Sequence, residues 1–192
     1  MPLPVGHALA GIAFFETRPG LFFKSRWLDA SFFIFLANLP DGDFLPGFLL
    51  GSPNRYHHGI FHSLGAALFV AVIIGWLFSR KKGHALKFFA FVFIIFCSHL
   101  LLDFFTLDFT PPYGLPLFWP FANGYHIAAH PVFINITRSP HSANFFSSLF
   151  SLHNLKAALL EIVLLGGVVL LVACIRRWAN DRPGRAATRQ SR

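Results

Sequence analysis

Charged residues are scarce in this chain of 192 residues. Only 12% of the residues are charged, whereas 55% are hydrophobic and 26 are phenylalanine. A soluble domain carries about twice that share of charge, so the composition indicates a protein embedded in a membrane. The 8 acidic residues are outnumbered by 10 histidines. That balance suggests metal binding, because imidazole is a common metal ligand.

Cysteine is scarce as well, and the two cysteines, Cys97 and Cys174, both lie in apolar runs. They exclude a disulfide framework and a thiolate metal motif. No basic region precedes the first apolar stretch, so we expect no cleavable signal peptide. The net charge of +8 is not accompanied by any nucleic-acid-binding motif, and we expect no nucleic-acid partner.

Apolar runs define the expected fold, an all-α integral membrane helical bundle. A span needs about 20 residues, and we predict about three full spans together with two short N-terminal membrane helices. The predicted full spans are 62–79, 85–105 and 155–175, and the short helices are 7–16 and 27–39. We assign residues 1–175 to one membrane-embedded domain and expect the basic tail, 176–192, to be disordered.

The basic residues predict the topology, because lysine and arginine favour the cytoplasmic side of a membrane. With the 80–87 turn in the cytoplasm, the 17–26 loop and the tail also lie there. All of the 16 basic residues except Arg55, Arg138 and Lys156 are then cytoplasmic. The same topology gathers every histidine except His84 on the opposite face. We therefore expect a multi-pass protein of the inner (plasma) membrane with a cytoplasmic C-terminal tail.

His99 and Asp103 lie near the end of the predicted span 85–105. Residues four apart share one face of a helix, so the imidazole and the carboxylate can reach the same metal ion. An ionisable pair inside a membrane indicates a functional site. The alternative is that the two side chains pair with each other and hold helices together.

Three further segments bring candidate ligands to the same face of the membrane. Carboxylate and imidazole ligands without thiolate suit a divalent zinc, manganese or iron ion, and zinc is our first choice. Two or more ions would allow phosphoester chemistry. The candidate metal ligands are His7, Asp41, Asp43, His57, His62, His99 and Asp103.

Five blocks of the sequence, taken in order, resemble the signatures of a known family, the YdjM-like inner-membrane proteins. They are Gly6-His7, Leu39-Pro40-Asp41-Gly42-Asp43, the run from His57 to Ser63, the run from Ser98 to Asp103, and the run from Gly114 to Pro120. The resemblance covers roughly residues 6–120. The family is described as metal-dependent hydrolases, and some members are called LexA-binding.

The resemblance implies a metal-dependent hydrolase with these histidines and aspartates around the ion. The family pattern His-Arg-Gly-x-Thr-His-Ser has arginine where this chain has His58, and threonine where it has Phe61. His58, when protonated, is a candidate for part of that arginine's contact with phosphate, and Arg55 and Arg138 are alternatives. The family is also remotely similar to zinc-dependent phospholipases C, whose His-x-x-x-Asp helix His99 and Asp103 resemble.

Several polar residues outside the blocks are further candidates. Glu161 lies within the last predicted span, where an acid is expensive unless it has a role; it could be a metal ligand, a general base or a structural partner. His126 and His130 either complete a metal site or cap a short helix. Thr106 matches a family position and is expected to hydrogen-bond to a ligand. The candidate catalytic residues are Asp41, Asp43, Glu161 and His58.

We therefore expect a membrane-bound hydrolase, acting on phosphoesters at the level of the lipid head groups on the extracytoplasmic face. Its expected partners are membrane lipid and a lipid-linked phosphoester substrate. The alternatives are a metal carrier and a regulatory scaffold without catalysis. The sequence leaves the oligomeric state open.

Overall fold

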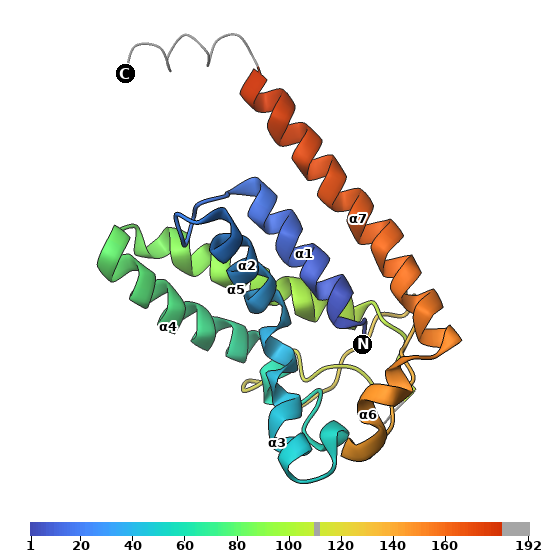
Figure 1. Ribbon diagram of the computed structural model, residues 1–192. Helices are drawn as coiled ribbons and strands as arrows, with labels where there is room; N and C mark the ends of the chain where they lie inside the picture. The colour runs from blue at the N-terminus through green and yellow to red at the C-terminus, as the bar shows by residue number, and fades with distance from the viewer. Residues whose placement is uncertain (110–111, 182–192) are drawn as a thin grey trace, which may run out of the picture.

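The chain folds into helices joined by short turns and one long irregular region. The computed structural model describes residues 1–109 and 112–181, without the side chains of 81 and 82. Within these residues there is no β-strand, only isolated bridges, so the predicted all-α fold is confirmed. The α-helices are α1 (Pro4–Thr17), α2 (Arg26–Asn38), α3 (Phe44–Leu49), α4 (Leu64–Lys82), α5 (Ala85–Phe104), α6 (Ser142–Leu149) and α7 (Leu152–Asp181) (Figure 1). The 3₁₀-helices are η1 (Leu39–Asp43), η2 (Pro53–Arg55) and η3 (Ile60–His62).

Two of the helices, α5 and α7, are long and apolar enough to cross a membrane. In α4 the apolar stretch, Leu64–Arg80, is shorter than a span. The helix begins later than predicted because the Ser63 hydroxyl accepts a hydrogen bond from the Ala66 amide at 3.1 Å and caps it. Length and composition thus support two of the three predicted spans, and the third stays a prediction.

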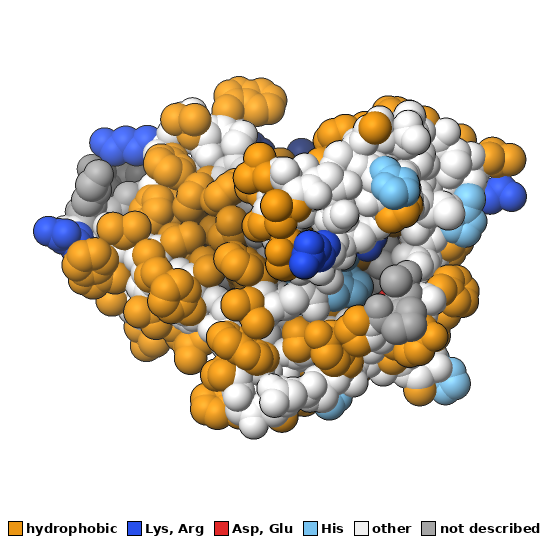
Figure 2. Space-filling model, turned by 90° about the horizontal axis from the view of Figure 1, so that it is seen from below, with side chains coloured by type: hydrophobic (Ala, Val, Ile, Leu, Met, Phe, Trp, Pro, Cys, Tyr) orange, Lys and Arg blue, Asp and Glu red, His pale blue; other side chains and the backbone are white. Residues whose placement is uncertain are grey.

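Helix α7 exposes apolar side chains along most of its length. Val163 and Leu170 are 70% and 68% exposed, and such continuous apolar surface is typical of contact with lipid. Figure 2 shows hydrophobic side chains covering much of the left half of the face seen from below, while the visible histidines gather on its right half. The surface is therefore divided between an apolar region and a polar, histidine-bearing region.

The two predicted short N-terminal helices are α1 and α2, and they pack against each other. Gly11 permits the close approach, since a Cβ there would lie only 2.7 Å from the Phe33 carbonyl oxygen. The buried Asp29 carboxylate closes the loop between them by accepting amide hydrogen bonds from Gly20, Phe22 and Phe23 at 2.6–2.9 Å. Because α1 also packs against α7, it is held between two helices.

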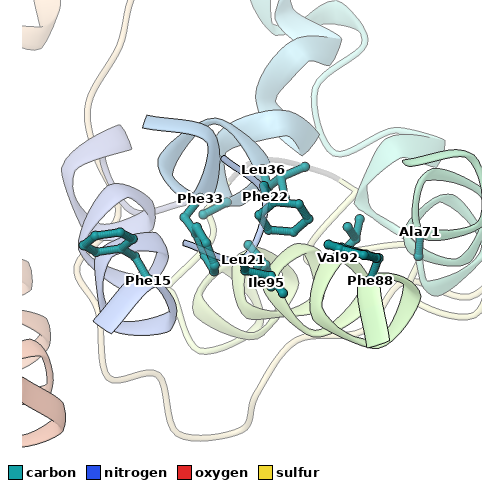
Figure 3. Close-up of a cluster of buried hydrophobic side chains, with 10 residues drawn as sticks. Phe15, Leu21, Phe22, Phe33, Leu36, Ala71, Phe88, Val92 and Ile95 are labelled. Atoms are coloured by element: carbon teal, nitrogen blue, oxygen red, sulfur yellow. The ribbon is translucent and has the colours of Figure 1, made fainter. Parts of the chain in front are cut away.

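A core of phenylalanine and aliphatic side chains joins α1, α2, α4 and α5 (Figure 3). The Phe22 ring lies at its centre, with ring centroids of Phe33, Phe78 and Phe88 at 5.2, 5.0 and 5.8 Å. Burying one such ring contributes about 1.5–3 kcal/mol. This core fixes the helices whose other ends carry the candidate ligands.

Helix α7 continues past the predicted domain boundary at residue 175 and ends at Asp181. Arg176 explains part of this extension, because its guanidinium lies 2.8 Å from the Glu16 carboxylate at the end of α1. Arg26 at the start of α2 lies 3.4 Å from the same carboxylate. The first residues of the expected disordered tail are therefore helical, while 182–192 lie outside the described residues.

Candidate metal centre

Four donor atoms from three elements meet at one point in the interior. His62 Nε2, at the end of η3, lies 3.2 Å from His99 Nε2 on α5. Asp103 Oδ2, one turn after His99, lies 3.3 and 3.2 Å from these two nitrogens. Asp41 Oδ1 of η1 lies 3.7 and 3.6 Å from them. His62, His99 and Asp103 are almost fully buried.

The spacings among His62, His99 and Asp103 match the edges of a tetrahedral coordination shell. Imidazole nitrogen and carboxylate oxygen bind zinc at about 2.0–2.2 Å, and the edge of a tetrahedron is about 1.6 times that length, or about 3.3–3.6 Å. The observed spacings within this group are 3.2–3.3 Å. One ion could bind these three donors together and leave a coordination position open, with the Asp41 carboxylate beside the group.

Neighbouring groups orient both imidazoles toward this point. His99 Nδ1 lies 2.8 Å from the Ala37 carbonyl oxygen, so it donates its proton there and turns the Nε2 lone pair toward the cluster. His62 Nδ1 lies 2.9 Å from Asp43 Oδ2, the carboxylate–histidine arrangement that supports metal-bound histidines. Asp43 thus lies at the outer edge of the cluster, where its other oxygen is 3.1 Å from His57 Nδ1.

His7 adds a second group of donors beside the first. Its ring stacks on His99 with centroids 3.7 Å apart, and its Nε2 lies 3.6 Å from Asp103 Oδ1. Asp103 therefore presents one oxygen to the four-donor group and the other toward His7. A carboxylate in this position can bridge two ions.

Several of the buried donor atoms lack hydrogen-bond partners within the described residues. Both nitrogens of His7 and both oxygens of Asp41 and Asp103 are in this state. An unpaired buried polar group is costly, and a buried charge more so. A divalent cation would satisfy these atoms together, so the residues present fit the metal that the sequence predicts.

His57 and His58 form the outer wall of the cluster. The His57 ring stacks on Phe44. His58 has a left-handed backbone (φ 59°), which aims its ring inward: Nε2 lies 4.0 Å from Asp103 Oδ2, and Nδ1 lies 3.7 Å from Asp108 Oδ2. Asp108 thus belongs to the site, and its carboxylate also accepts a hydrogen bond from the Gly114 amide.

Burial and charge act on the histidine pKa values in opposite directions. Burial disfavours the imidazolium of His62, but the carboxylates of Asp103, Asp41 and Asp43 outweigh it and raise the pKa well above its ordinary value. For His57 and His58, burial dominates and lowers the pKa. His58 is therefore neutral near pH 7 and can accept a proton.

Glu161, on α7, contacts the start of α1 and does not belong to the donor cluster. Its carboxylate accepts hydrogen bonds from the Leu3 and Gly6 amides at 2.8 and 3.0 Å. Such amides at a helix start have no partner within the helix. Gly6 is required here, because a Cβ would lie 2.7 Å from Glu161 Oε2. Glu161 therefore holds the turn that carries His7, through backbone amides and not through a histidine.

The remaining candidates lie apart from the donors. His126 forms a backbone bridge with Leu115 and packs against Phe118, and His130 is exposed. Neither sits on the short helix that the sequence suggested. The Thr106 hydroxyl donates a hydrogen bond to the carbonyl of Leu102, four residues earlier in the chain, at 2.7 Å.

A polar cavity of about 700 Å³ opens beside the cluster. It lies against His57 and His58 and is lined on its other sides by charged and amide groups. These include Asn54, Arg55, Asp108 and Arg138. The volume suits a small polar ligand.

An all-helical membrane-type protein with a buried histidine–aspartate cluster is the class that this fold and site define. The model of the family named YdjM inner membrane protein matches residues 1–179. The chain therefore belongs to the YdjM inner membrane protein family. No curated protein and no solved structure matches it.

The cluster predicts metal binding that depends on Asp103. Asp103→Asn replaces a bridging carboxylate with an amide, a far poorer ligand, and should weaken zinc binding by more than about tenfold. Asp181→Asn, at the exposed end of α7, is the matched control and should keep full affinity. Metal content after dialysis, measured by mass spectrometry on purified protein, tests this. Full retention of metal by Asp103→Asn would remove that residue from the ligands.

The contacts of Glu161 predict a structural role. Glu161→Gln retains one oxygen that can accept an amide hydrogen bond. Glu161→Ala leaves the Leu3 amide without its partner, while the Gly6 amide keeps its bond to the Leu3 carbonyl, and should lower the free energy of unfolding by about 1–3 kcal/mol. Thermal unfolding in detergent, with metal content measured in parallel, distinguishes the variants. A Glu161→Gln protein that melts like wild type and retains metal but loses all turnover would instead make Glu161 a catalytic group.

Proposed function

We propose that this protein is a membrane-bound, metal-dependent hydrolase of phosphoesters at the level of the lipid head groups. The observation that carries the proposal is the buried group of His62, His99 and Asp103, whose spacing suits one metal ion, whose aspartate oxygens have no hydrogen-bond partner in the described residues, and which adjoins a cavity. A purely structural pair of histidine and aspartate would have satisfied its own polar atoms.

A divalent ion held by His62, His99 and Asp103 would keep a position open for water, act as a Lewis acid and lower the pKa of that water to about 7. His58 is the best-placed proton carrier among the candidate catalytic residues, since it lines the cavity, lies 4.0 Å from Asp103 and is neutral near pH 7. Asp43 lies 2.9 Å from His62 Nδ1 and would orient that imidazole, while Asp41 lies beside the donor group on its Nε2 side. Asp108 lies 3.7 Å from His58 Nδ1 and orients that ring.

The reaction is tested with paired substrates on detergent-solubilised protein. We expect phosphate release from a phospholipid or polyprenyl phosphate, inhibited by a chelator and reduced at least about 100-fold by Asp103→Asn. The same head group without its chain should be a poorer substrate, because the apolar surface of α7 and α5 holds a lipid chain near the site. Equal turnover of the chainless compound would overturn the lipid part, and turnover indifferent to chelator and to Asp103→Asn would overturn the metal-dependent reaction.

We further propose that the donor cluster faces the extracytoplasmic side and that α7 ends in the cytoplasm. The support is the basic surface at the α4–α5 turn and the end of α7, against the histidines at the other ends of the helices. Single cysteines at Lys87 and His141, both exposed, test it in a background without Cys97 and Cys174. An impermeant thiol reagent applied to intact cells should label His141→Cys alone. Labelling of Lys87→Cys alone would reverse the orientation.

A further inference from the structure

Two arginines line the cavity, Arg55 and Arg138, and Arg138 is the less exposed of the two. Arg138 Nε donates a hydrogen bond to Asn54 Oδ1 at 2.8 Å, and its guanidinium lies over the Phe44 ring at 5.3 Å. Within the described residues it forms no ion pair, whereas Arg26 and Arg176 both pair with Glu16. The aspartates of the cluster attract this partly buried guanidinium, but none lies within ion-pair distance of it in the described residues, so it can bind an anion in the cavity.

The contacts of Arg138 fix the direction of its free edge. The Nε–H group is used in the hydrogen bond to the Asn54 amide oxygen, and one face of the guanidinium packs on the Phe44 ring. The terminal nitrogens therefore remain for a ligand. A planar guanidinium donates two parallel hydrogen bonds to oxygens of a phosphate. Phe44 also stacks on His57, with centroids 4.1 Å apart, so the arginine is held next to the wall of the donor cluster.

The cavity connects this arginine to the candidate metal ligands. His58 lines the same cavity and lies 4.0 Å from Asp103 Oδ2. A phosphate in the cavity would therefore have the guanidinium on one side and the donor cluster on the other.

We infer that Arg138 binds the non-reacting oxygens of a phosphoryl group and thereby positions a phosphoester against the donor cluster. This inference rests on the proposed function and specifies its substrate: an anionic phosphate with a polar head group that fits about 700 Å³. Asn54 is then a positioning residue, since it touches the arginine and holds its plane.

Phosphate affinity tests the inference directly. Zinc-loaded full-length protein in a neutral detergent is titrated with inorganic phosphate by calorimetry, and in a second arm with phosphatidic acid in mixed micelles. Arg138→Gln should weaken binding at least tenfold. Arg138→Lys keeps the charge but cannot donate two parallel hydrogen bonds, so its affinity should lie between those of the wild type and Arg138→Gln. Arg80→Gln is the matched control, because Arg80 also stacks on an aromatic ring, Trp76, but lies at the α4–α5 turn.

The inference is supported if Arg138→Gln binds phosphate or phosphatidic acid more weakly while its metal content and the binding by Arg80→Gln are unchanged. The titration that is affected then identifies free phosphate or lipid phosphate as the ligand. Wild-type affinity of Arg138→Gln in both arms, or no binding by the wild type in either, overturns it. If Arg138→Gln does not fold, Asn54→Ala replaces it and should weaken binding severalfold; unchanged affinity overturns the inference equally. Hydrolysis is measured separately, so phosphate binding without turnover would contradict the proposed function alone.

Discussion

The cost of burying unpaired imidazole and carboxylate groups is the constraint on which the site depends. Asp103 and its neighbouring donors lie in a largely apolar protein, with several nitrogens and oxygens that no described residue satisfies. Each such group costs about 1–3 kcal/mol if left unpaired, and a charged one costs more. A cation bound among them would offset this cost, and the groups could hold one.

The helices hold the donors in place with ordinary packing. The phenylalanine core joins α1, α2, α4 and α5 away from the cluster, and it sets the distances between the ends that carry His7, Asp41 and His99. Glu161 completes the arrangement, because it ties the first turn of α1 to α7 through two buried hydrogen bonds. A long apolar helix thereby anchors the element that bears His7.

Much of the cluster could be predicted from the sequence, because it depends on residue spacing within one helix and on the membrane topology. The four-residue spacing of His99 and Asp103 predicts one helix face, and the basic residues predict that the other histidines share a membrane face. The described residues bring all seven candidate metal ligands together, although no ion is assigned to them. The pattern alone could not separate Asp43, which orients His62, from Asp41, which points inward.

Contacts between distant segments were beyond prediction. The role of Glu161 depends on where the start of α1 meets α7, and nothing near Glu161 in the sequence indicates that contact. The pairing of Asn54 with Arg138 and the inward turn of His58 toward Asp108 depend in the same way on tertiary packing. The extension of α7 to Asp181 depends in part on the ion pair between Arg176 and Glu16. A boundary placed from composition alone takes no account of such a contact.

The central claim is that the cluster binds a metal through nitrogen and oxygen, and X-ray absorption at the zinc edge of the purified protein tests it most directly. The account predicts a shell of nitrogen and oxygen at about 2.0–2.2 Å, with the scattering pattern of at least two imidazole rings and no sulfur. A protein that binds no zinc, or a shell with sulfur at about 2.3 Å, would contradict it.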